Sequence, residues 1–353
     1  MIKVKLYELE KHRNECAFRP YLWANEILRD VGIELTTGDS YDYAWVAQAS
    51  IIDKKVSLEK SVENGLEFLS NITGDYMILD GQDSTSLIGT YEVFKESDAL
   101  LLLKNSLLKD RSLYKEGWNL GRYYWGSGDY KLEDFDKHAD RIVLSGTNWI
   151  STHWASVKTQ KDQQPGPFWL DYFNYWKNKK YDLAAMYQYP SVKDNYEHGF
   201  LQSSYYDKHR AKSINVINEL DIKVAKLENG KRVSESEYYS RLMHSKIILA
   251  PLGYGEMAPR DFEAAMFGAV LIKPDMSYID TVPNVFIKDE TYIACNHDFS
   301  DLSEKIEMIL GSTEKYHYII ENARSKFEEE YTKENLATHV YRIFESLNGV
   351  SYE

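Results

Sequence analysis

Cysteine, long apolar runs and basic charge are all scarce in this chain of 353 residues. Its two cysteines, Cys16 and Cys295, permit one disulfide at most and lack the spacing of a zinc site, which fits a reducing compartment. The longest aliphatic run, from Ala99 to Leu103, is far shorter than the roughly 20 residues that cross a bilayer. The first residues alternate charged and apolar side chains, unlike the apolar core of a signal peptide. We therefore expect a cytoplasmic protein without a transmembrane segment, either free or peripheral to a membrane.

The charge balance bears on possible partners. Lys and Arg number 42 against 55 Asp and Glu, a net charge of −13. Proteins that bind nucleic acid through its phosphates normally use clustered Lys and Arg, so this charge argues against nucleic acid unless a basic cleft is hidden. Aromatic residues make up 14% of the chain. Such amphipathic rings suit sugar faces and interfaces, and they serve equally well as packing.

Strands and helices alternate along the first 155 residues. The apolar patterns predict strands at 2–6, 33–36, 76–79, 99–103 and 141–144, and helices at 20–31 and 56–70. A polar, tryptophan-rich segment at 156–180 then interrupts the alternation. From 181 to 330 the pattern resumes, with strands at 181–186, 222–227, 246–250 and 269–272 and helices at 205–220, 236–243 and 259–267. Three helices are predicted from Asp301 onward. Alternation of this kind favours an α/β fold with two mainly parallel sheets.

The segment HSKIILAPLGYGEMAPRDFEAAMFGAVLIKPD places a strand, a glycine-containing loop, a helix and another strand in one unit. Gly253 and Gly255 let the backbone approach a ligand closely, and the helix beginning near Pro259 offers free N–H groups to an anion. Arg260 would bind a diphosphate there, and Glu263, one turn later, would accept hydrogen bonds from ribose hydroxyls. Arg260 and Glu263 would also pair with each other on an exposed helix, and the spacing does not decide between these roles.

From about Tyr181 onward the chain resembles the nucleotide-sugar-binding domain of GT-B glycosyltransferases, especially the spore-maturation-like and exostosin-like branch. The resemblance lies in the segment above and in the later VPNVFIKDETYI and SDLSEKIEMIL. It implies two Rossmann-like domains facing across a cleft: an acceptor domain at 1–155, an aromatic linker at 156–180 and a donor domain at 181–330. It also implies that a C-terminal helix at 331–353 packs back on the first domain.

The resemblance further implies donor-site residues. In the R-x-x-E-A-x-x-x-G motif of that group, Arg260 and Glu263 lie beside the donor. Glu256 resembles the first acidic residue of a paired-glutamate motif, but its spacing to Glu263 is one residue short, which puts a retaining mechanism and its own role in doubt. The donor would be a UDP-, GDP- or other nucleotide-activated sugar bound without a metal or other cofactor. Asp134-Phe135-Asp136 matches the D-x-D pattern of metal-dependent transferases of another fold, but lies in a charged helical stretch.

Two further positions are candidates for donor contacts. Arg210, with His209 and Lys212 beside it, lies near the start of the predicted helix at 205–220, where relatives carry basic residues that contact phosphate. Solvated charge on a helix is the alternative. Asn284, with Phe286, follows a Pro-containing loop and would border the base or the sugar. Surface turns have the same composition.

The first domain would supply the catalytic base of an inverting enzyme. Asp80 and Asp83 flank Gly81 directly after a predicted strand, so we take them as candidates, with Lys104 as a partner for one of them. An Asp-Gly turn in which Asp83 caps the next helix is the alternative.

We thus expect a glycosyltransferase that moves a sugar to a glycan or other hydroxyl acceptor, in surface polysaccharide or related glycan assembly. Three alternatives stay open: a nucleotide-sugar isomerase or epimerase, a catalytically silent glycan-binding protein, and a phage-type DNA-modifying glycosyltransferase. The oligomeric state is undetermined.

Overall fold

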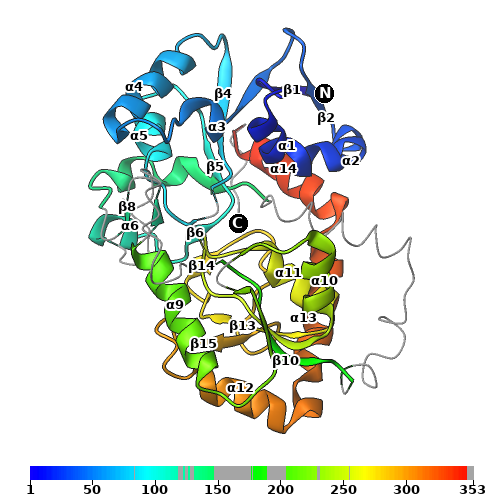
Figure 1. Cartoon of the computed structure of the whole chain (residues 1–353). Coiled ribbons are helices and arrows are strands. Elements are labelled where there is room, and N and C mark those ends of the chain that lie inside the picture. The colour runs from blue at the N-terminus through cyan, green and yellow to red at the C-terminus, as the bar shows by residue number, and fades with distance from the viewer. Residues whose placement is uncertain are drawn as a thin grey trace. The chain divides into compact units, whose positions relative to one another are not determined.

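The computed structural model describes residues 1–82, 84–117, 122–123, 126–127, 131–146, 176, 178–188, 204–228, 231–253 and 255–347 (Figure 1). The chain divides into two compact units. Unit 1 comprises Met1–Thr152, Ile279–Pro283 and Glu330–Glu353, and unit 2 comprises His153–Tyr278 and Asn284–Glu329.

Unit 1 contains a six-stranded parallel sheet in the order β2-β1-β3-β4-β5-β9. The strands are β1 (Ile2–Leu6), β2 (Ile33–Thr36), β3 (Tyr43–Ala47), β4 (Asp75–Asp80), β5 (Leu102–Lys104) and β9 (Ile142–Leu144). Its helices include α1 (His12–Trp23), α2 (Asn25–Asp30), α3 (Gln48–Ile51), α4 (Leu58–Leu69), α5 (Thr90–Lys95), α6 (Leu113–Glu116) and α14 (Lys333–Leu347). Two short antiparallel ribbons pair β6 (Leu107–Leu108) with β14 (Ile279–Asp280), and β7 (Arg122–Tyr123) with β8 (Gly126–Ser127). Short 3-10 turns at Phe135–Lys137 and Ala139–Arg141 precede β9.

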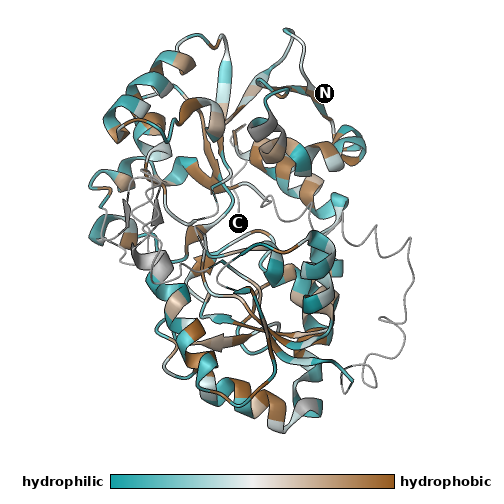
Figure 2. Ribbon diagram, viewed as in Figure 1, coloured by the Kyte–Doolittle hydropathy of each residue, from teal (hydrophilic) through white to brown (hydrophobic). Residues whose placement is uncertain are grey.

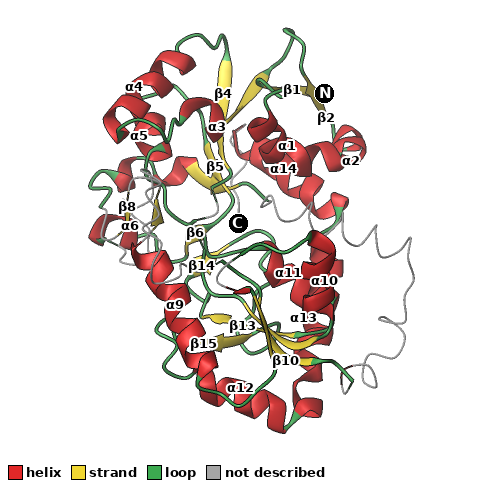
Figure 3. Ribbon diagram, viewed as in Figure 1, coloured by secondary structure: helices red, strands yellow, loops and turns green. Residues whose placement is uncertain are grey.

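Unit 2 contains a five-stranded parallel sheet in the order β11-β10-β12-β13-β15. The strands are β10 (Tyr181–Ala185), β11 (Val224–Lys226), β12 (Ser245–Leu249), β13 (Val270–Pro274) and β15 (Ile293–Cys295). The helices are α9 (Ser204–Asn218), α10 (Glu235–Met243), α11 (Pro259–Met266), α12 (Leu302–Gly311) and α13 (His317–Glu330), with a 3-10 turn at Thr313–Tyr316. Figure 3 shows the strands of each unit with helices around them.

Both sheets share one topological feature that positions a site. In each, the first strand in chain order lies between the second and the third, so the chain winds outward in both directions from it. In such open sheets ligands bind outside the carboxyl ends of the strands, where the winding reverses. This point lies between β1 and β3 in unit 1, and between β10 and β12 in unit 2.

Helix α14 completes the core of unit 1 although it comes last in the sequence. Its buried residues Val340, Ile343 and Phe344 join one hydrophobic cluster with α1, α2 and the sheet. The Phe344 ring stacks on that of Trp45 in β3, with centroids 6.2 Å apart and planes at 12°. The helix therefore carries an apolar stripe facing the sheet and polar residues elsewhere, as its alternating colours in Figure 2 show.

The predictions of an α/β fold, of two parallel sheets and of a C-terminal helix returning to the first sheet are confirmed. Some details were wrong, and the strand β15 was not predicted. The first helix begins at His12, runs through Pro20 and ends at Trp23, where the sequence suggested a start at Pro20. The strand β3 was not predicted, because four of its five residues are buried and it lacks the alternation that marks a half-buried strand.

Candidate functional site

The loops after β10 and β12 adjoin each other at the reversal point of unit 2. Tyr187 lies two residues beyond β10, and residues Leu252 to Gly255 follow β12. Gly253 donates its backbone N–H to the carbonyl of Gly255 at 3.0 Å, which closes a tight turn. Both glycines are buried, as the sequence led us to expect for a loop that approaches a ligand closely.

Helix α11 begins directly after this turn, and its start is strongly fixed. Pro259 occupies the first helical position. The Asp261 carboxylate accepts the backbone N–H of Ala258 at 2.8 Å and pairs with the buried ammonium of Lys273 at the end of β13. Lys273 also donates to the Glu256 carbonyl at 2.7 Å. Burial raises the pKa of Asp261 and lowers that of Lys273, and their mutual contact opposes both shifts. This ion pair was not predicted from the sequence, and it holds the start of α11 against the end of β13.

Arg260 lies in the first turn of α11 and has an unusual environment. Its Nε and Nη1 atoms are buried and have no hydrogen-bond partner among the described residues. Burial works against its charge, yet the neighbouring Tyr238, Asp261 and Glu263 raise its pKa above the ordinary value. The side chain is therefore a permanent cation with uncommitted N–H donors, which is costly to bury unless an anion can bind.

Glu263 is 1% exposed and does not lie on an open helix face. One of its carboxylate oxygens accepts the hydroxyl of Tyr238, from α10, at 2.7 Å. Burial and the Glu263 charge raise the pKa of Tyr238, so its hydroxyl keeps its proton and donates. The sequence left open that Glu263 pairs with Arg260 on an exposed helix. In the structure Glu263 is buried and contacts Tyr238, a residue that no sequence signal indicated.

The basic cluster on α9 is divided among three environments. Arg210 is buried and donates to the carbonyls of Gln188 at 2.9 Å and Leu252 at 3.4 Å, so it joins the loops after β10 and β12. The buried His209 ring accepts the backbone N–H of Leu252 at 3.3 Å. Lys212 lies at the surface, 3.9 Å from Asp298. The structure therefore brings Arg210 to the site and leaves Lys212 outside it.

The two remaining candidates of unit 2 differ in burial. Glu256 is 1% exposed and lies between the glycine turn and α11. Asn284 is exposed and follows the cis peptide bond between Val282 and Pro283. No described contact joins Asn284 to Arg260 or Glu263.

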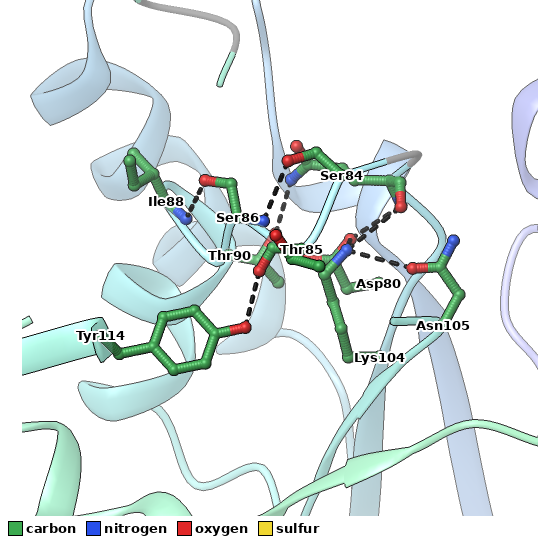
Figure 4. A network of polar contacts seen from close by, with 10 residues as sticks. Asp80, Ser84, Thr85, Ser86, Ile88, Thr90, Lys104, Asn105 and Tyr114 are labelled. Atoms are coloured by element: carbon green, nitrogen blue, oxygen red, sulfur yellow. Dashed lines mark hydrogen bonds and ion pairs between the residues drawn. The ribbon is translucent and has the colours of Figure 1, made fainter. Parts of the chain in front are cut away.

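In unit 1, Asp80 ends β4 in a buried polar network (Figure 4). Asp80 and Lys104 are both 0% exposed, with their charged atoms 3.4 Å apart. Lys104 also donates to the Gln82 carbonyl and to the Asn105 side chain, at 3.1 and 3.2 Å. The expected pairing with Lys104 is therefore present, and such burial favours a structural role for Asp80 over proton transfer with an acceptor. Asp83 lies outside the described residues.

A second polar cluster occupies the reversal point of the unit 1 sheet. Glu8, just beyond β1, has a positive φ of 53° and accepts the Ser50 hydroxyl at 2.8 Å. The buried Asn14 donates to the same Ser50 oxygen at 2.7 Å. Gln48 is also buried, and no described residue accepts a hydrogen bond from its Nε2. Strained backbone and unsatisfied buried donors are more common at functional sites than elsewhere. No sequence signal indicated Glu8.

Unit 1 also holds a pocket of about 260 Å³. It is lined by Trp23 at the end of α1, by Gly146 after β9, by Pro283, and by His339 and Arg342 of α14. His339 shares a hydrogen bond of 2.9 Å with the Leu144 carbonyl.

Both aspartates of the D-x-D pattern contact other side chains of unit 1. Asp134 accepts the Tyr91 hydroxyl at 2.9 Å, and Asp136 pairs with Lys115. Within the described ranges no three His, Cys, Asp or Glu side chains gather to hold a metal ion. Over the same residues, no helix has both the length and the apolar character needed to span a membrane.

Comparison with known families supports the resemblance seen in the sequence. Residues 201–341 match a family model described as glycosyl transferase-like. This range holds Arg210, the glycine turn, Arg260, Glu263 and Asn284. The expectation of a glycosyltransferase-family enzyme is confirmed at this level, whereas the particular branch is not shown. Comparison with curated proteins gave no match.

Three solved structures that are similar to this chain share little of its sequence. HepE from Anabaena in complex with UDP aligns with a TM-score of 0.47 and 10% identity over 99% of both chains. Sucrose-phosphate synthase from Thermosynechococcus elongatus gives 0.43 and 13% identity over 88% of this chain and 75% of that one. A glycosyltransferase from Rickettsia africae gives 0.41 and 13% identity over 99% of both. The fold described above rests on the strand order and not on these values.

Proposed function

We propose that this protein is a glycosyltransferase of the GT-B type that binds a nucleoside diphosphate sugar at the carboxyl edge of the unit 2 sheet. The observation that carries the proposal is the Arg260 guanidinium, which is charged, is buried at Nε and Nη1, and finds no acceptor for these two atoms in the part of the chain that the structure describes. It lies at the N-terminus of α11, where the helix dipole adds to its attraction for an anion. A bound diphosphate would accept hydrogen bonds from Arg260 and carry its negative charge at the positive end of the helix dipole.

The neighbouring groups fit the rest of such a donor. Gly253 and Gly255 carry no Cβ, so the backbone at these two positions can approach a ligand closely. The Tyr238 hydroxyl donates to one oxygen of Glu263 and so orients the carboxylate, which by its position on α11 would accept ribose hydroxyls. Glu256 and Asn284 remain candidates for the sugar or the base of the donor.

Transfer itself needs few protein groups. The bond between the sugar C1 and the diphosphate oxygen breaks, a new bond forms between C1 and the acceptor oxygen, and the acceptor proton passes to a base. Arg260 and the helix terminus stabilise the negative charge on the leaving diphosphate. Within this proposal the acceptor is a glycan hydroxyl, and the enzyme serves surface polysaccharide or related glycan assembly.

The test begins with calorimetric titration of UDP, GDP, CMP, dTDP and ADP and their common sugars, with and without EDTA. We expect one nucleotide to bind, and Arg260→Ala to weaken its binding by about 1.5–3 kcal/mol, the range for hydrogen bonds to charged groups. Arg29→Ala, an exposed arginine of unit 1, is the matched control and keeps full affinity. Unchanged affinity in a folded Arg260→Ala variant would remove the diphosphate role.

Product analysis separates the alternatives. Release of free nucleoside diphosphate together with a glycosylated acceptor identifies transfer, whereas conversion of the nucleotide sugar without release identifies an isomerase or epimerase. A folded protein that binds no nucleotide would favour a silent glycan-binding protein. Incorporation of the sugar into DNA would identify the DNA-modifying alternative.

For an inverting reaction, we propose that the base is a carboxylate of unit 1. Asp80 is buried in an ion pair with Lys104, so of the two predicted carboxylates Asp83 is the remaining candidate. We add Glu8 as a second candidate, because its side chain is 21% exposed and lies at the reversal point of the sheet. Glu8→Gln, Asp83→Asn and Asp80→Asn should be compared in steady-state kinetics. We expect one of the first two to lower kcat by about 10²–10⁴-fold with nucleotide affinity intact, the range for loss of a general base. Full activity in both would place the base elsewhere.

A further inference from the structure

Tyr187 contacts two cationic side chains of unit 2. Its ring is 1% exposed and follows β10 at the reversal point of the sheet. The guanidinium carbon of Arg210, from α9, and that of Arg260, from α11, each lie 5.7 Å from its ring centroid. One aromatic ring thus contacts cations from two helices, within the distance at which cation–π attraction acts.

The two guanidinium groups use this ring differently. Arg210 has hydrogen bonds to the carbonyls of Gln188 and Leu252, so its orientation is fixed by the backbone. No described residue accepts a hydrogen bond from Nε or Nη1 of Arg260, so hydrogen bonds at those atoms do not orient it. Contact with an aromatic face holds a guanidinium without consuming its N–H donors. The ring can therefore fix Arg260 and still leave these donors for a ligand.

The ring itself is held by a directed chain of hydrogen bonds. The Ser213 hydroxyl donates to the Arg210 carbonyl at 2.7 Å, which uses its single proton. The Tyr187 hydroxyl, 2.7 Å from the same Ser213 oxygen, must then be the donor in their contact. This chain ties the hydroxyl end of Tyr187 to the backbone of α9, and close packing around a ring that is 1% exposed restricts its rotation.

We infer that Tyr187 is a positioning residue that holds Arg260 for the diphosphate of the donor and so sets affinity for that part of the ligand rather than for the nucleoside. The inference rests on the proposed function. Two like charges approach the same ring in a buried site, and a bound diphosphate, carrying the opposite charge, offsets their repulsion. Loss of the ring should therefore lower the affinity for the nucleoside diphosphate and leave the affinity for the nucleoside unchanged.

The experiment compares each nucleoside diphosphate with its own nucleoside, such as UDP with uridine and GDP with guanosine, by calorimetry on the full chain. Tyr187→Leu removes the aromatic face, and Tyr187→Phe keeps the face and removes the hydroxyl. We expect Tyr187→Leu to weaken the diphosphate about tenfold relative to its nucleoside, and Tyr187→Phe to stay within about threefold of the wild type. Tyr316→Leu, another buried tyrosine of unit 2, is the control for general loosening and should leave the ratio unchanged.

A double-mutant cycle with Arg260→Ala tests the mechanism. If Tyr187 acts through Arg260, the double variant loses no more diphosphate affinity than Arg260→Ala alone. If Tyr187→Leu does not fold, Tyr187→Met replaces it in the same cycle. Equal loss of nucleoside and diphosphate, or additive losses in the cycle, would overturn the inference and leave the proposed function standing. A wild-type protein that binds no nucleoside diphosphate would overturn the proposed function itself.

Discussion

The buried charged residues of this protein differ in whether another side chain of opposite charge pairs with them, and this difference distinguishes structural residues from candidate ligand-binding ones. Asp80 with Lys104, and Asp261 with Lys273, are enclosed carboxylate–ammonium pairs, and each pair also satisfies nearby backbone groups. Removing one partner from such a pair leaves an uncompensated buried charge, so these pairs hold local structure. Arg260 differs because no described carboxylate forms an ion pair with it, and its Nε and Nη1 have no acceptor among the described residues. The unmatched charge is the more informative signal of a ligand.

His339 in the unit 1 pocket gives a prediction at the same scale. Burial lowers its pKa from the ordinary 6.5, nearby Arg342 adds to the shift, and the contact with the Leu144 carbonyl opposes it. Because the unfolded chain takes up a proton at a higher pH than the folded one, stability is full above pH 6.5 and falls as pH drops into the window below it. Glu330 and Arg342 also line the pocket, so each pH series needs a matched reference.

The matched reference is His339→Gln, which keeps an N–H donor for Leu144 and does not titrate. Urea unfolding between pH 8 and pH 5 should show the wild type losing more stability on acidification than this variant. Parallel pH profiles for the two proteins would contradict a neutral, buried His339.

At the scale of elements, periodicity and glycine position predicted most of the fold. The start of α11 at Pro259 and its end before Gly268 followed from local rules, and Gly268 has the positive φ of 60° that ends helices in this way. Buried strands without alternation, such as β3, gave no comparable signal.

The candidate site was predictable only where its residues are close in sequence. Gly253, Gly255, Arg260 and Glu263 share one short segment, so spacing could indicate them. Tyr238 meets Glu263 from 25 residues away, and Tyr187 reaches Arg260 from another strand end. With 28 tyrosines in the chain, composition could not identify either one, because only the packing of α10 and α11 and the order of the strands bring them to the site.

At the scale of the whole molecule, chain order and structural unit do not coincide. Unit 1 takes its last helix and the short segment Ile279–Pro283 from beyond most of unit 2, yet each unit encloses its own hydrophobic cluster. Separate cores predict that the two units respond differently to a ligand that binds only one of them. The proposed donor site is composed entirely of unit 2 residues, whereas α14 stabilises unit 1.

Differential scanning calorimetry of the full chain tests this division. Phe344→Ala removes a 1% exposed ring from the unit 1 core, and we expect it to cost about 3–5 kcal/mol and to lower the transition of that unit. That shift assigns the transitions. A nucleoside diphosphate at 100 times its Kd should then stabilise the other transition by about 2.7 kcal/mol, in both the wild type and Phe344→Ala. Its stabilising effect should be reduced in Arg260→Ala, because the ligand then binds less tightly. Ligand stabilisation confined to the transition that Phe344→Ala lowers would instead place the nucleotide site in unit 1 and contradict the assignment to Arg260 and Glu263.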